Sequence, residues 1–422
     1  MDSTIETQAP ADGAAPKDAE AQPESKRLMS VDALRGFDMF WIIGAGSLVG
    51  ALERMTDNSV VTFISYQLEH AEWAGFRFYD LIFPLFLFIV GVSLVFSLSK
   101  EIQRDGRKSA LKRLFRRAAL LFVVGLFYSG GFKNEWPDIR LLGVLQRLAL
   151  GYFFGGLIFC FFRPRGRVVV AVSILVGYWA LMTFVPIRDI QLDDEHLDLV
   201  VKQTGEHDIA VHFADTTDRV RGKYEPGLNL SNHLDYQYLP GKRYDKYWDP
   251  EGLLSTLPAI VTCLLGVFAG MLLRDKSVKD MRKVKLLAIG GVACLVVGYV
   301  WGMQFPIVKK IWTSSFVLVA GGWSFLLLAV FYLVIDVWKI RRWSLPFVWI
   351  GMNSITIYLT NNIIGYPGFQ RVAERFAGGN VKSFINDSMM KGLGDLVVVL
   401  VGLGLSIVFV WYLHRRKIFL RL

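Results

Sequence analysis

The sequence predicts an all-α polytopic membrane protein with about ten transmembrane helices and both termini in the cytoplasm. Of its 422 residues, 53% are hydrophobic, among them 31 Phe and 12 Trp. These residues gather in long runs, and about 20 consecutive apolar residues are enough for a helix to span a bilayer. Alternate connections between the runs are rich in Lys and Arg, which predicts the orientation. Together these two observations define the fold class.

Ten apolar runs along the chain predict the membrane helices. They lie near residues 31–52, 79–99, 111–132, 139–162, 168–186, 252–273, 285–305, 312–335, 343–364 and 393–414. Residues 1–26 are rich in Ala, Pro, Glu and Asp, and are predicted to be a disordered cytoplasmic tail. Residues 27–422 are predicted to form one transmembrane domain, which includes a long extracytoplasmic loop at about 187–250.

Basic runs mark the side of the membrane that faces the cytoplasm. They are KEIQRDGRK with KRLFRR within 100–117, RPRGR at 163–167, RDKSVKDMRKVK at 274–285, KIRR at 339–342 and HRRK at 414–417. Short cytoplasmic loops carry such an excess of Lys and Arg, whereas long segments cross the membrane regardless of charge. The net charge of +10 therefore serves orientation and contact with anionic lipid, and it requires no nucleic-acid partner.

The long loop contains four histidines, but their spacing matches no metal-ligand motif. They are His196, His207, His212 and His233. The three cysteines lie inside apolar runs, where packing explains them. We therefore expect neither a metal site nor a disulfide framework.

A titratable cluster precedes the second apolar run. The stretch LEHAEWAGFRFYD, residues 68–80, carries His70 between Glu69 and Glu72 and ends on Asp80. The basic runs predict that this loop lies outside the cytoplasm. Simple hydration would explain its polar side chains if the loop stood alone.

Two further polar groups are expected on the same outer side as His70. YWDPEGLL places Asp249 and Glu251 just before the predicted helix 252–273. GVLQRL places Gln146 and Arg147 inside the predicted helix 139–162. An arginine at membrane depth costs about 3 kcal/mol or more, so Arg147 should face the protein interior and an acidic or anionic partner.

A second polar set is expected in the cytoplasmic half of the membrane. In SVDALRGFD, Asp32, Arg35 and Asp38 recur every three residues and therefore share a helix face. An internal ion-pair ladder and a ligand site explain this pattern equally well. Five polar side chains in the run 343–364 predict the lining of a cavity, although bonds between helices would account for some of them. They are Asn353, Ser354, Thr356, Asn361 and Asn362.

Five motifs, in this order, resemble the heparan-α-glucosaminide N-acetyltransferase family of transmembrane acyltransferases. They are RLMSVDALRGFDMF, HAEWAGFRFYDLIFPLFLFIVG, GVLQRL, DPEGLLSTLPAIVTCLLGVFAG and PFVWIGMNSITIYL. The resemblance implies that the acetyl group of cytosolic acetyl-CoA passes to the amine of a glucosamine-type sugar across the membrane. Because the chain lacks the luminal domain and first helix of the lysosomal enzyme, we expect a bacterial member in the inner (cytoplasmic) membrane, acting on a periplasmic acceptor.

The resemblance places the family's active histidine at His70, within the same H-A-x-W-x-G context. A histidine can take a proton from the acceptor amine near neutral pH, or attack the thioester and carry the acetyl group itself. Both routes remain open. The expected catalytic residues are His70, Asp80 and Glu251; those for acetyl-CoA are Arg35, Arg147, Gln146, Asn353 and Ser354; those for the sugar are Asp249, Glu72 and Asn362.

One departure from the family concerns an asparagine close to the active site of the lysosomal enzyme. This sequence has Gly46 near that position. Either Asn353 has taken over the role of that amide, or the acceptor pocket differs.

The alternative function is a carrier for N-acetylglucosamine or a related sugar, as bacterial relatives are often labelled. Carriers typically contain repeated halves with interrupted helices at matching positions, and this sequence has no such symmetry. The expected partners are acetyl-CoA, an amino-sugar acceptor and membrane lipids, and a homo-oligomer is an open alternative.

Overall fold

The computed structural model describes residues 28–188 and 219–420, except for 57 and 366, together with residues 194, 198, 201 and 202. The predicted tail at 1–26 lies outside the described residues. So do most of the residues between 189 and 218, including His196, His207 and His212.

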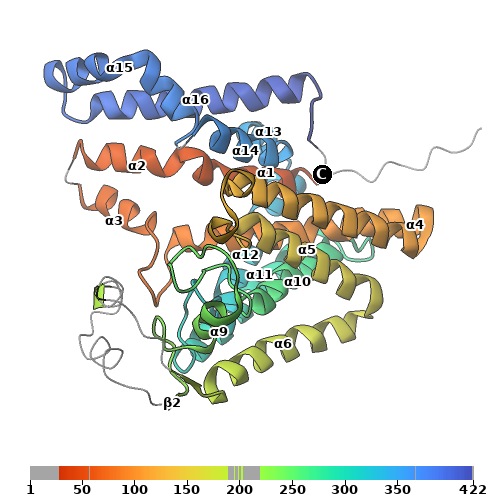
Figure 1. The fold of residues 1–422 in the computed structure, drawn as a ribbon. Coiled ribbons are helices and arrows are strands. Elements are labelled where there is room, and N and C mark those ends of the chain that lie inside the picture. Colours follow the sequence, from red (N-terminus) through yellow and green to blue (C-terminus); the bar gives the residue numbers. More distant parts are fainter. Residues whose placement is uncertain are drawn as a thin grey trace, which may run out of the picture.

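The described chain is built almost entirely from helices (Figure 1). The long and medium helices are α1 (Met29–Phe40), α2 (Gly46–Glu53), α3 (Ser59–Gln67), α4 (Phe78–Tyr128), α5 (Val144–Phe161), α6 (Pro164–Phe184), α9 (Leu230–Tyr238), α10 (Thr256–Arg274), α11 (Asp280–Gly302), α12 (Ser314–Phe331), α13 (Leu345–Met352), α14 (Ser354–Ile364), α15 (Phe369–Ser388) and α16 (Leu393–Arg415). Short helical turns are η1 (Trp41–Ala45), η2 (Gly131–Lys133), η3 (Trp136–Asp138), η4 (Tyr332–Val337) and η5 (Arg342–Ser344). Two short strands, β1 (Ile187–Arg188) and β2 (Arg219–Val220), pair antiparallel with Ile187 opposite Val220.

Eight helices within the described residues are long and apolar enough to cross a membrane. They start at Met29, Phe78, Val144, Pro164, Thr256, Asp280, Ser314 and Leu393. The predicted class, an all-α polytopic membrane protein, is confirmed. The number of crossings and the side on which the termini lie remain predictions.

The 51-residue helix α4 is a hairpin of two helices. Gly106 interrupts it with φ 80° and ψ 174°, a conformation that glycine adopts without steric cost. Glu101 on one side of the break forms an ion pair with Arg113 on the other side, and it accepts a hydrogen bond from the hydroxyl of Ser109. Residues twelve apart in a straight helix would be about 18 Å apart, so the chain must turn back at Gly106. The two predicted spans at 79–99 and 111–132 correspond to the two arms.

The predicted span at 343–364 is wrong as a single helix. The chain forms two short helices, α13 and α14, which meet at Asn353, where φ −119° and ψ 23° interrupt the helical path. The apolar composition of this segment runs through the break, which is why the sequence predicted one continuous element. Three helices that the apolar runs did not predict, α3, α9 and α15, lie in the connections.

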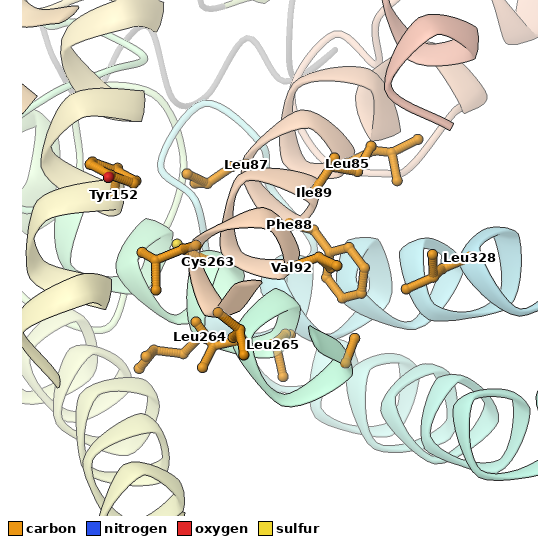
Figure 2. Close-up of a cluster of buried hydrophobic side chains, with 14 of the residues drawn as sticks. Leu85, Leu87, Phe88, Ile89, Val92, Tyr152, Cys263, Leu264, Leu265 and Leu328 are labelled. Carbon is orange, nitrogen blue, oxygen red and sulfur yellow. The ribbon is translucent and has the colours of Figure 1, made fainter. Parts of the chain in front are cut away.

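The first arm of α4 forms the centre of the core (Figure 2). Side chains such as Leu85, Phe88 and Val92 are buried among residues of α5, α10 and α12. The backbones of α4 and α10 approach closely, because a Cβ at Gly91 would lie 2.0 Å from the carbonyl oxygen of Cys263 and one at Gly266 would lie 1.9 Å from that of Phe88. Small residues allow helices in lipid to make such contacts. This rigid pair carries the start of α4, where the candidate site lies.

Candidate active site

A large cavity of about 1100 Å³ lies between α1, the two arms of α4, α5 and α14. One end is lined by His70, Glu72, Asp80, Glu251 and Lys309, and further along are Asp32, Arg35, Ser93, Ser97 and Arg117. Asp80 and Ser97 both belong to the first arm of α4 and are 17 residues apart, which corresponds to about 25 Å along a helix. The cavity therefore extends over most of the ~30 Å thickness of a bilayer core.

His70 and Asp80 form a hydrogen-bonded pair at one end of this cavity. The Nδ1 atom of His70 is 2.9 Å from Oδ1 of Asp80. The His70 side chain is 54% exposed, whereas that of Asp80 is 1% exposed. The ring also packs against Tyr79, with 4.8 Å between ring centroids. A buried carboxylate that accepts the Nδ1 proton leaves Nε2 of the imidazole free to act as a base or nucleophile.

The start of α4 explains why Asp80 points at His70. Asp80 is the third residue of the helix, and its Oδ2 accepts hydrogen bonds from the backbone N–H groups of Arg77 and Ala71, both at 3.1 Å. The first bond belongs to a capping box, and the second ties down the loop that carries His70. A carboxylate at this position is also favoured by the positive end of the helix dipole. With Oδ2 occupied in this way, Oδ1 is directed towards the imidazole.

Lys309 is the third member of the His70 cluster, and it comes from the connection between α11 and α12. Its Nζ lies 3.1 Å from Nδ1 of His70 and 3.4 Å from Oδ1 of Asp80. Burial lowers the pKa of Lys309, while the charges of Asp80 and Glu251 act in the opposite direction. The cluster thus contains one carboxylate, one amine and one imidazole in direct contact.

A network of charged residues forms the neighbouring wall. The guanidinium of Arg140 donates to both carboxylate oxygens of Asp249, at 2.8 and 2.7 Å, and to Glu251 at 2.7 Å. Although burial opposes it, these two carboxylates raise the pKa of Arg140. Burial raises the pKa of Glu251, and the nearby Arg147 and Arg140 counteract this effect. Glu251 lines the cavity, whereas Asp249 is buried behind it.

Arg147 lies behind the cavity wall and faces the protein interior, as predicted. The acidic partner that was also predicted is not among its hydrogen-bond or ion-pair partners in the described part of the chain. The guanidinium of Arg147 donates to Ser255 and to the carbonyl oxygen of Gly252, and it stacks 4.9 Å from the ring of Trp312. Trp312 lines the cavity, but Arg147 and its neighbour Gln146 do not. In this arrangement Arg147 supports the loop that carries Glu251.

The far part of the cavity contains the polar residues of α1. Arg35 donates to Ser93 and to Asp32, the latter at 3.4 Å. Asp38 is not part of this ladder: it is fully buried, and its carboxylate has no hydrogen-bond partner among the described residues. The predicted three-member ladder is therefore wrong in its last member. The residues of α1 that line the cavity are Val31, Asp32, Arg35 and Met39, and Asp38 is not among them.

The polar residues of the broken segment are distributed differently from the prediction. Ser354 lines the cavity at the start of α14, but the other four predicted lining residues do not. Asn353 is buried at the helix break, where its Nδ2 donates to the carbonyl oxygen of Trp349 at 3.3 Å. Asn362 is exposed near the end of α14. Because the break at Asn353 changes the direction of the chain, side chains beyond it cannot follow one continuous stripe.

The structure thus brings together six of the eleven residues that the sequence analysis assigned to catalysis, acetyl-CoA or the sugar. The cavity is lined by His70, Glu72, Asp80, Glu251, Arg35 and Ser354. It also contains two residues that the sequence analysis missed, Arg140 and Lys309. One signal could have pointed to Lys309, because Lys309 and Lys310 form a basic pair in a connection predicted to face away from the cytoplasm.

Comparisons with known proteins agree with the motifs. A family model described as the catalytic region of heparan-alpha-glucosaminide N-acetyltransferase matches residues 27–194, which include His70, Asp80 and Arg140. The mouse heparan-alpha-glucosaminide N-acetyltransferase is 28% identical over 400 residues, covering 84% of this chain and 57% of the mouse protein.

The human protein of the same name is 26% identical over 454 residues, covering 96% of this chain and 62% of the human protein. Over most of its length, this chain is therefore similar to the mouse and human heparan-alpha-glucosaminide N-acetyltransferases. It spans about three fifths of the length of these two curated relatives. The family resemblance predicted from the five motifs is confirmed at low identity over most of the chain.

Proposed function

We propose that this protein transfers the acetyl group of acetyl-CoA to the amine of a glucosamine-type sugar on the opposite side of the membrane. The observation that supports this most is the continuous cavity, which holds a His70–Asp80 pair at one end and Arg35 and Arg117 towards the other. The names of the mouse and human relatives support the acceptor part of this proposal, because they describe N-acetyl transfer to a glucosaminide.

The arginine end suits the donor. Coenzyme A carries several phosphate charges, and guanidinium groups bind phosphate through short, paired hydrogen bonds. Arg35 and Arg117 line the cavity. A smaller pocket that shares Ser97 with it is lined by Arg104 and Arg113. The mostly apolar walls between the two ends, formed by residues such as Phe86 and Leu148, suit the uncharged arm that carries the thioester.

The His70 end suits the chemistry. On one route Nε2 removes a proton from the acceptor ammonium, and the free amine attacks the thioester carbonyl to release the coenzyme thiolate, which is then protonated. On the other, Nε2 attacks the thioester first and the acetyl-imidazole is then cleaved by the amine. On both routes Asp80 holds the ring in position and stabilises the positive charge that develops on it. Glu72 and Glu251 flank the site and can receive the acceptor's ammonium and hydroxyl groups.

We propose that the His70 end faces the periplasm of a bacterial inner membrane. The support is the alternation of basic connections: the Gly106 turn of α4 and the start of α11 belong to the basic set, whereas the His70 and Lys309 loops join the opposite ends of the same helices. Acetyl-CoA would then enter from the cytoplasm.

A sided assay tests the proposed function. The purified protein is placed in liposomes that contain glucosamine, and acetyl-CoA with a labelled acetyl group is added outside. Protein molecules whose basic connections face the outside of the vesicle should produce labelled N-acetylglucosamine inside it. A carrier, the alternative function, would move sugar without transferring label, and that outcome would exclude the acetyltransferase.

The His70→Ala variant is the matched control for this assay. It should lose about two to four orders of magnitude in turnover, which is the usual effect of removing positioned acid–base catalysis. Its coenzyme affinity should remain unchanged, because Arg35 and Arg117 lie further along the cavity. Label trapped on the wild-type protein without acceptor, and absent from His70→Ala, would identify the acetyl-imidazole route. A folded His70→Ala protein with wild-type turnover would exclude His70 from the reaction.

A further inference from the structure

Lys309 makes contacts with His70 that a simple histidine–carboxylate pair does not need. Its Nζ lies within hydrogen-bond distance of Nδ1 of His70, at 3.1 Å, and 3.4 Å from Oδ1 of Asp80. The lysine is 239 residues from His70 in the sequence. Only the tertiary fold brings the two together.

The backbone holds the Lys309 loop against the His70 loop. The N–H of Gly75 donates to the carbonyl oxygen of Ile307 at 2.8 Å, and Ala74 and Val308 form an antiparallel bridge. On its other side the loop is closed by the N–H of Val308, which donates to the hydroxyl of Thr313 at 3.0 Å. Lys309 is thus presented to His70 by two fixed segments. Its side chain is 21% exposed, so its ammonium has limited access to water.

The three groups compete for one proton position. Nδ1 of His70 can donate to Asp80, which leaves Nε2 free, or accept from Lys309, which places the ring proton on Nε2. Only the first arrangement leaves Nε2 reactive. An ammonium that bonds to Oδ1 of Asp80 permits this arrangement, and it also balances the carboxylate charge that would otherwise favour a protonated ring.

Other charged groups around His70 are arranged so that they do not replace Lys309. On α4 the charged group is Asp80, and the uncharged ring of Tyr79 packs against the imidazole. In the His70 loop, Arg77 donates to the carbonyl oxygen of His70 and pairs with Glu69, while Glu72 lines the cavity. Across the cavity, Glu251 is bound to Arg140. Among the described residues, Lys309 is the cation that lies within hydrogen-bond distance of the His70 imidazole.

We propose that Lys309 is a positioning residue that keeps His70 neutral in the resting site, with Nδ1–H directed at Asp80 and Nε2 open to the cavity. The inference rests on the proposed function for its catalytic meaning, but the state of the ring can be measured without any substrate. Removing the ammonium should let Asp80 stabilise the protonated ring. His70 would then need a higher pH to become neutral.

The test follows the reaction of His70 with diethyl pyrocarbonate, which acylates an imidazole only when the ring is neutral. The modified peptide is quantified by mass spectrometry at a series of pH values, without acetyl-CoA or sugar. In Lys309→Met and Lys309→Gln the midpoint of the pH curve should rise by about one to two pH units, the usual effect of losing a neighbouring like charge. Lys309→Arg should stay near the wild-type midpoint.

Lys310→Met is the matched control. Lys310 is the next residue, has a similar exposure of 25%, and pairs with Asp245 at 3.7 Å instead of Asp80. Its loss should leave the His70 curve unchanged. An unchanged curve in folded Lys309→Met and Lys309→Gln protein would overturn the proposal, as would an equal shift in Lys310→Met. A shifted curve in a protein that transfers no acetyl group would support the role of Lys309 and contradict the proposed function instead.

Discussion

Replacing Asp80 by asparagine should reverse the hydrogen bond to His70 without changing the size of the side chain. In the native protein Oδ2 of Asp80 accepts from the N–H groups of Arg77 and Ala71, and Oδ1 faces Nδ1 of His70. The amide oxygen of the asparagine must take the Oδ2 position, because only an acceptor satisfies two backbone donors. The amide NH₂ then points at Nδ1 and donates to it. The ring proton is forced onto Nε2, the atom that should act as base or nucleophile.

The expected loss of turnover is about three to four orders of magnitude, the range seen when a catalytic histidine is held in the wrong tautomer. Asp80→Ala should also be impaired, but it lacks the donor that enforces the wrong tautomer. Transfer of label from acetyl-CoA to glucosamine measures both variants, and coenzyme affinity is measured in parallel. Affinity should not change, since Asp80 lies about 25 Å along α4 from Ser97 at the donor end.

Asp245→Asn serves as the control, because Asp245 pairs with Lys310 and makes no recorded contact with His70. Its turnover should stay within about threefold of wild type, because Asp245 does not line the cavity. The reasoning would be refuted if folded Asp80→Asn protein turned over as fast as Asp245→Asn. In that case neither the tautomer of His70 nor its bond to Asp80 would matter for the reaction.

Three further predictions concern the rest of the cavity. Arg35→Ala should weaken acetyl-CoA binding about 10- to 100-fold, because a charged hydrogen bond is lost. Arg54→Ala is the control and should not weaken binding, because its partner Asp395 lies outside the cavity. Equal affinities of the two variants, measured by calorimetry, would remove Arg35 from the donor site. Arg140→Ala leaves Asp249 and Glu251 without their shared partner and should destabilise the protein by roughly 3–5 kcal/mol; a thermal midpoint equal to that of wild type in detergent would contradict this. Burial raises the pKa of Asp235, in the α9 segment, to about 7, so between about pH 4 and 7 the folded chain keeps a proton that the unfolded chain has lost. Stability should therefore fall as the pH rises through this window, by at most ~4 kcal/mol, and the fall should disappear in Asp235→Asn; a wild-type midpoint that rises with pH relative to the variant would show the sign to be wrong.

The amino-acid sequence by itself determined the class of the protein. Runs of about 20 apolar residues can satisfy their backbone hydrogen bonds in lipid only as helices, so composition and length are sufficient to place most spans. The sequence also pointed to His70 and Asp80. These residues are only ten positions apart, and the helix cap that orients Asp80 is a local structure.

The tertiary structure decided which distant side chains meet. Arg140 reaches Asp249 across 109 residues and Lys309 reaches His70 across 239. No local pattern encodes such contacts. The same holds for Asp38 and Asn362, whose residue types suggested a site but which do not line the cavity. The apolar pattern of a membrane helix fixes its length, because the bilayer selects for length and hydrophobicity. The rotation of the helix about its axis and its choice of neighbours depend on how the helices pack against one another. Rotation and packing together determine which charged side chains line the cavity.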